Sequence, residues 1–113
     1  MNTKNEVVCA RIRLKPDSLP LVREWAAYIA AHREEALRTL EAEGVVIESV
    51  FLDTVEGVDY LVYYMRAPSL KKAEVVAVKS LADVDLYHQN FKKTTWEKVS
   101  RLELLVDLDR SNT

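Results

Sequence analysis

The feature that most constrains this sequence is a pair of predicted strands, residues 45–53 and 58–66, lying between two helical regions. Apolar and polar side chains alternate along both segments, a period that is typical of β-strands. The connection at residues 54–57 includes Gly57, which can adopt a positive φ. We expect a hairpin whose loop is somewhat longer than the tight two-residue kind. A hairpin with helices on both sides leaves few folds open.

Two further strands are predicted near the ends of the chain. Residues 7–15 alternate until Pro16 removes a backbone donor, and residues 101–109 alternate in the same way. From about residue 19 to residue 43, apolar side chains recur at helical spacing, which predicts one long helix. Gly44 supplies its stop, because glycine adopts the left-handed capping conformation at low cost.

The second helical region is predicted in two pieces. Ser69 opens the first piece, and Asp85 can cap a second piece that runs over residues 86–98. The order is therefore β-α-β-β-α-β with short connections. This is the ferredoxin-like α+β arrangement, a four-stranded antiparallel sheet with its helices on one face. Residues 1–113 are expected to form a single domain.

Composition narrows the function classes. The formal net charge of −2 argues against nucleic-acid binding, which needs a basic face. No stretch approaches the ~20 apolar residues of a membrane span, and no signal peptide is recognisable. Cys9 is the single cysteine, so an internal disulfide is excluded and a cytoplasmic location is expected. The scattered His, Cys and Glu residues match no metal-ligand spacing, and two glycines are too few for a phosphate-binding loop.

The sheet face away from the helices is expected to be mixed in character. It carries apolar and charged side chains together: Val7, Cys9, Leu105 and either Phe51 or Val50, with Arg11, Arg13, Glu103 and Asp107. Such a face is too apolar for water and too charged for a plain core. A two-fold homodimer that packs sheet against sheet would bury the apolar groups and pair the charges.

Three segments carry a resemblance to a known superfamily: ESVFLD at residues 48–53, DYLVYYMR at 59–66 and DVDLYHQNFKKTTW at 83–96. With these segments, the chain resembles the dimeric α/β-barrel superfamily, and within it a family of short, uncharacterised bacterial proteins. The superfamily includes cofactor-free monooxygenases, haem-degrading enzymes, polyketide cyclases and isomerising enzymes. The resemblance implies a ligand site in each subunit, between the sheet and its helices.

His88 and Glu48 are the leading candidates for catalysis. His88 lies three residues beyond Asp85, where a helix N-terminus favours a neutral imidazole that can act as a base, a donor or a haem ligand. Glu48 lies mid-strand among apolar neighbours, so burial should raise its pKa. The structural alternatives are a packed, hydrogen-bonded histidine and an ion-paired or edge glutamate.

Tyr64 is the third catalytic candidate. On the central third strand its hydroxyl would pair with Glu48, and strand parity places Tyr60 beside them. The same parity assigns Ser49, Phe51 and Tyr63 to the opposite face. Core packing with a bonded hydroxyl is the alternative for these tyrosines. Further ligand-binding candidates come from the helical regions: Trp25, His32, Asp85 and Trp96.

These observations predict a dimeric protein that binds a small organic molecule and needs no cofactor. His88 would shuttle a proton, while Glu48 and Tyr64 polarise or orient the substrate for monooxygenation, cyclisation or isomerisation. Two alternatives stay open. One is a non-catalytic dimeric binding or interaction module, and the other is a haem-binding protein that uses His88.

Overall fold

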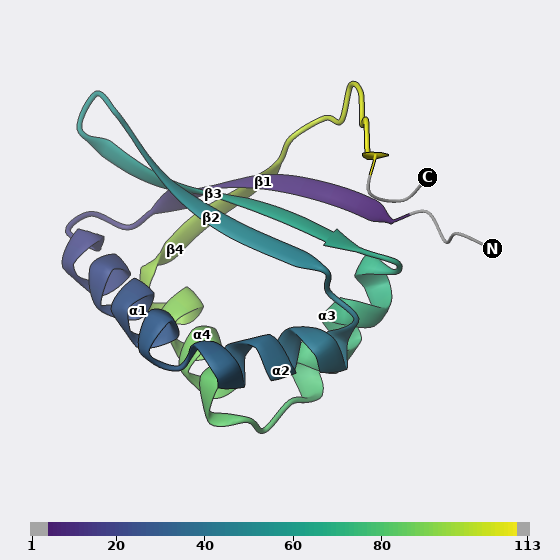
Figure 1. Cartoon of the computed structure of the whole chain (residues 1–113). Coiled ribbons are helices and arrows are strands. Elements are labelled where there is room, and N and C mark those ends of the chain that lie inside the picture. Colours follow the sequence, from purple (N-terminus) through teal and green to yellow (C-terminus); the bar gives the residue numbers. More distant parts are fainter. Residues whose placement is uncertain (1–4, 111–113) are drawn as a thin grey trace.

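The computed structural model describes residues 5–110. Within that range, four antiparallel strands form one sheet in the order β2-β3-β1-β4, and four helices lie on one of its faces (Figure 1). The ferredoxin-like α+β arrangement is therefore confirmed, with each helical region made of two helices. The elements are β1 (Glu6–Leu14), α1 (Leu19–Ala31), α2 (Arg33–Glu43), β2 (Ile47–Val55), β3 (Val58–Ala67), α3 (Leu70–Lys79), α4 (Asp83–Thr95) and β4 (Trp96–Arg101).

The hairpin between β2 and β3 closes more tightly than expected. Val55 pairs with Val58, so the loop is only Glu56 and Gly57. Both residues have positive φ, 50° and 78°, as a type I′ turn requires. The prediction of a longer loop is wrong, because the left-handed pair matches the twist of the strands and lets them run to the turn.

The pairing register decides which side chains share a face. Glu48 pairs with Met65, and Val50 pairs with Tyr63. Paired residues differ by an odd number, so even-numbered residues of β2 share a face with odd-numbered residues of β3. The predicted grouping of Glu48 with Tyr60 and Tyr64 is therefore wrong, since Glu48 lies on the face of Tyr63.

The predicted long helix is interrupted at His32, which separates α1 from α2. The His32 backbone leaves helical geometry, with φ −113° and ψ 36°, and its Nδ1 lies 2.8 Å from the carbonyl oxygen of Tyr28. A side chain that contacts a helical carbonyl competes with the backbone ladder. The Tyr28 ring also stacks between His32 and Tyr87, at 4.1 and 3.9 Å.

The predictions for the helix ends had mixed outcomes. Gly44 has φ 77° and ends α2 as expected, and the Ser69 side chain accepts a hydrogen bond from the Lys72 amide at the start of α3. Asp85 is not a cap, because α4 begins at Asp83.

The last strand lies earlier than predicted. Trp96–Arg101 pairs with β1, and Leu102 adds one more hydrogen bond from its amide to the Cys9 carbonyl. The prediction of a strand over residues 101–109 is wrong, since β4 ends at Arg101 and residues 102–109 lie outside the strands of the sheet. Alternation marks an extended segment but does not identify what it pairs with.

The core between sheet and helices is divided in two. One cluster contains Ile12, Leu14, Val22, Trp25, Leu61, Tyr63 and Phe91. A smaller one contains Val45, Ala67 and Ala73. Trp25 of the first cluster and both Val45 and Ala73 of the second line a common cavity. The sheet and helices are therefore packed on both sides of an open space.

Candidate functional site

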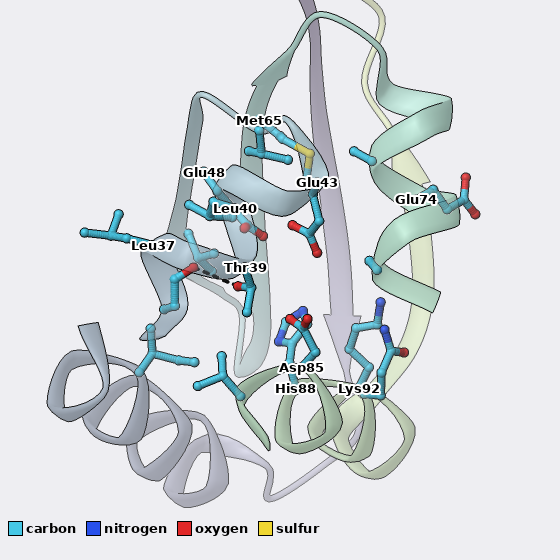
Figure 2. Close-up of a pocket in the computed structure, with 18 of the residues that line it drawn as sticks. Leu37, Thr39, Leu40, Glu43, Glu48, Met65, Glu74, Asp85, His88 and Lys92 are labelled. Carbon is cyan, nitrogen blue, oxygen red and sulfur yellow. Dashed lines mark hydrogen bonds between the residues drawn. The ribbon is translucent and has the colours of Figure 1, made fainter. Parts of the chain in front are cut away.

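A cavity of about 700 Å³ lies between the helical layer and the sheet. All four helices contribute to its wall, together with Glu48 and Val50 of β2 and Met65 of β3. Most of the wall is apolar, and a few charged side chains converge on one part of it (Figure 2). Cavities of this size with few polar groups are typical of small-molecule sites.

One face of α4 supplies three of the polar groups. Asp85, His88 and Lys92 all line the cavity, and their spacing of three and four residues places them on the same side of the helix. Figure 2 shows them rising from α4 into the cavity. Each is half-buried.

Two glutamates face this group from the other side. Glu43 is the last residue of α2, because Gly44 turns the chain there toward β2. Glu48 lies near the start of β2 on the helix-facing side. Figure 2 shows both carboxyl groups pointing into the cavity toward Asp85 and His88. The end of α2 and the start of β2 thus place two carboxyl groups, five residues apart in the sequence, in the same cavity.

The surroundings raise the pKa of both glutamates. Burial is the main cause that raises the pKa of Glu43 to about 7, and the charges of Asp85 and Glu48 add to it. Burial also raises the pKa of Glu48, Lys92 partly opposes the rise, and Asp85 adds to it. A carboxyl group with a pKa near neutrality can both accept and return a proton.

His88 is neutral at physiological pH. Burial, followed by the charge of Lys92, lowers the pKa of His88 to about 4. The neutral state was predicted from the helix N-terminus, but burial is its larger cause. The Trp25 indole N–H donates a hydrogen bond to His88 Nδ1 across 3.2 Å.

Aromatic rings hold His88 in place. Trp25 stacks on Phe91 with ring centres 4.7 Å apart and lies 5.7 Å from the imidazole. Tyr63 lies 6.2 Å from the imidazole, and its buried hydroxyl has no hydrogen-bond partner among the described residues. Burial raises the pKa of Tyr63, with Glu48 adding to the effect, so its phenol stays protonated.

Four of the predicted site residues gather at the cavity, namely His88, Glu48, Trp25 and Asp85. Tyr60 and Tyr64 lie on the opposite face of the sheet. There, Arg11 lies 3.7 Å above the Tyr60 ring, and the Tyr64 hydroxyl accepts a hydrogen bond from Arg66. The expected pair of Glu48 with Tyr64 is therefore absent, because the hairpin register separates them.

Two helical candidates also lie outside the cavity wall. His32 is exposed and contacts Tyr28, at the break between α1 and α2. Trp96 begins β4 rather than lying in a helix, and its ring packs edge-on to Tyr63 at 5.3 Å.

Glu43 and Lys92 belong to the cavity but were not predicted as site residues. The signal for Glu43 was available, because a glutamate directly before a glycine helix stop opposes the helix dipole. Lys92 follows His88 at helical spacing, but paired lysines in a helix usually lie on a solvated face, which gave no reason to single it out.

Over residues 5–110, no three His, Cys, Asp or Glu side chains are arranged to hold a metal ion. In the same range, no helix has both the length and the apolar character to cross a membrane.

A family profile described as a family of unknown function, DUF6176, matches residues 5–113. The chain belongs to the DUF6176 family. No protein in a curated set matches its sequence significantly.

Two solved structures are similar to this DUF6176 chain in fold. One is a protein provisionally named an antibiotic biosynthesis monooxygenase, from Bacteroides thetaiotaomicron. It has 15% identity and a TM-score of 0.60, over 97% of this chain and 96% of that chain. The other is PA3566 from Pseudomonas aeruginosa, with 18% identity and a TM-score of 0.54, over 94% and 98%. At these identities the likeness shows a common fold, as the resemblance to the superfamily implied.

Proposed function

We propose that the cavity binds a small, partly apolar organic molecule and that Glu43 and Glu48 exchange a proton with it. The observation that carries this proposal is the pair of desolvated carboxyl groups that face neutral His88 across one cavity. An ionised carboxylate of the pair removes a proton from carbon next to a carbonyl group, and the resulting acid returns it elsewhere. His88 contacts the substrate without carrying charge.

This chemistry serves the reaction classes expected from the sequence. Removal of the proton leaves an enolate, from which isomerisation and cyclisation proceed without a cofactor. The same electron-rich carbon can instead add dioxygen to form a hydroperoxide. Loss of water from it leaves one oxygen atom in a new carbonyl group, which is the balance of a monooxygenation. The Bacteroides protein of the same fold is named for monooxygenase activity, and a shared fold does not choose among these reactions.

Proton exchange with solvent tests the proposal before any product is known. The wild-type protein is incubated in deuterated water with a panel of β-diketones and aryl ketones, and loss of the α-proton signals is followed by NMR. We expect exchange above the buffer rate for at least one compound, and a fall of about 100-fold or more in Glu43→Gln or Glu48→Gln. Glu41→Gln, on the exposed side of α2, is the matched control and should match wild type.

Exchange at the buffer rate for every compound would overturn catalysis of this kind. Compounds that shift the cavity resonances without exchanging would instead support the non-catalytic binding module. Exchange that persists unchanged in both glutamine variants would remove the two glutamates from the reaction.

We also propose a homodimer through the sheet face that the helices leave open. Its support is a set of exposed apolar side chains on that face and on the segment after β4: Ile47, Phe51, Leu102, Leu104, Leu105, Val106 and Leu108. Contiguous exposed apolar surface of this kind favours association. A cytoplasmic location belongs to the same proposal and is supported by free Cys9.

Several charges on the open face already have partners within the chain. Arg11 pairs with Asp53 at 3.6 Å, and Arg13 pairs with Glu97 at 3.0 Å, both within the chain. Arg66 pairs with Asp107. Ion pairing across the two-fold axis is therefore not needed, and apolar burial is the driving force of the proposed dimer.

A further inference from the structure

We propose that Trp25 is a positioning residue that makes His88 a hydrogen-bond donor, so that the cavity takes a ligand with an acceptor oxygen or nitrogen at that point. This deepens the proposed function, on which it rests for the identity of the site. Of the roles open to His88 from the sequence, this selects the hydrogen-bond donor in place of the preferred proton shuttle.

The bond between the two side chains determines the tautomer. The indole nitrogen of Trp25 can only donate, so His88 Nδ1, at 3.2 Å, must present a lone pair. A neutral imidazole carries one N–H, which is then on Nε2. Because His88 lines the cavity and Nδ1 is engaged by Trp25, Nε2–H is the group left for a ligand.

Packing on several sides fixes the orientation of the Trp25 ring. Its side chain is 8% exposed, and its ring lies nearly parallel to Phe91, with an angle of 5° between the planes. Tyr63 packs against it from β3 with ring centres 6.4 Å apart. Because packing fixes the Trp25 donor, the imidazole adopts the tautomer that accepts its hydrogen bond.

The donor role defines the chemistry of the ligand. A carbonyl oxygen placed at Nε2–H is polarised without needing a positive charge, and negative charge that develops on it is stabilised there. The proton leaves the neighbouring carbon for a carboxylate of the glutamate pair. Substrate class and residue roles thus agree: an acceptor group meets His88, and an acidic C–H meets Glu43 and Glu48.

The same bond argues against haem at this site. Histidine that binds iron through Nε2 carries its proton on Nδ1. That proton would point at the Trp25 N–H at hydrogen-bond distance, where two donors repel. His88 therefore does not fit a haem ligand.

Nitrogen-15 NMR of histidine-labelled protein tests the assignment directly. At neutral pH we expect His88 to show one unprotonated and one protonated ring nitrogen, with the proton on Nε2. His32→Gln removes the only other histidine signal. Trp25→Phe keeps an aromatic ring but deletes the indole N–H, and we expect its two nitrogen signals to move toward each other as the tautomers mix.

Trp96→Phe is the matched control. Trp96 also packs against His88, with ring centres 6.5 Å apart, but its buried indole N–H bonds to no described residue. We expect the His88 tautomer to be unchanged in this variant.

A wild-type spectrum with the proton on Nδ1, or with both nitrogens protonated, would overturn the inference, and this result needs no variant to fold. An unchanged tautomer in a folded Trp25→Phe protein would overturn the role of Trp25. Because tautomer and α-proton exchange are separate readouts, a failed exchange assay with the expected tautomer counts against the proposed reaction alone.

Discussion

At the scale of single residues, two groups in one cavity have pKa values that are shifted in opposite directions. Glu43 has a raised pKa of about 7 and His88 a lowered pKa of about 4, both chiefly because burial disfavours charge. Between about pH 4.5 and 7, folded Glu43 holds a proton that the unfolded chain has released, so stability falls as pH rises. Between about pH 4 and 6.5, unfolded His88 holds a proton that the folded protein lacks, so stability rises.

Because the two groups change stability with pH in opposite directions, replacing Glu43 and replacing His88 should change the pH dependence of stability in opposite ways. Glu43→Gln removes the falling part, so its stability should rise with pH between about 4.5 and 6.5 more than that of wild type. Above about pH 7 it should be more stable than wild type by about 1 kcal/mol, a modest value because the side chain is partly screened by water. His88→Gln removes the rising part instead, so between about pH 4 and 6.5 its stability should rise with pH less than that of wild type. Urea unfolding at a series of pH values measures both.

The control for this comparison is Glu41→Gln, an exposed change on the same helix. Its free energy of unfolding should change with pH in the same way as that of wild type. Parallel curves for Glu43→Gln as well would contradict the raised pKa of Glu43.

At the scale of elements, local signals position the cavity wall. Gly44 ends α2 next to Glu43, and the Ser69 hydroxyl accepts the Lys72 amide at 3.1 Å to begin α3. Caps of this kind satisfy backbone groups that the helix cannot pair itself. They therefore determine where the carboxyls and the α3 wall lie.

Ser69→Ala should lower the free energy of unfolding by about 1 kcal/mol, because the first amides of α3 lose an acceptor. Thermal or urea unfolding measures the change. Ser18→Ala provides a comparison, since Ser18 precedes α1 without a side-chain cap bond. A Ser69→Ala effect no larger than that of Ser18→Ala would show that the cap contributes little.

Sequence reasoning reached the element order, the stop of α2 at Gly44, the start of α3 at Ser69 and four cavity residues, because these depend on local periodicity and residue type. It failed where the outcome depends on pairing. The two-residue turn changed which tyrosine faces Glu48, and residues 102–109 lie outside the strands of the sheet despite their alternating pattern. For Glu43 the unfavourable place at the helix end was readable from the sequence, but its burial was not, because helices far away in the sequence complete the cavity.

At the scale of the whole molecule, the two faces of the sheet have different roles. The helix side holds the cavity, while the open side and the segment after β4 expose apolar groups, with Leu105 at 85% and Val106 at 72%. Exposed hydrophobic side chains concentrated in one segment favour burial against a second copy.

Leu105→Glu should convert the proposed dimer to a monomer while leaving the fold intact, because Leu105 makes little contact within its own chain. Sedimentation should give twice the 13.0 kDa chain mass for wild type and a single chain mass for the variant. Leu81→Glu, 83% exposed between α3 and α4, is the matched control and should stay dimeric. A wild-type mass near 13 kDa would refute the dimer.

The central claim is that the cavity holds carboxyl groups able to exchange protons near neutrality. Carbon-13 NMR of the glutamate carboxyls, followed over pH and assigned with Glu43→Gln and Glu48→Gln, measures this without any ligand. The predicted result is a midpoint of about 7 for Glu43 and one above the ordinary 4.5 for Glu48. Midpoints near 4.5 for both residues would contradict the claim.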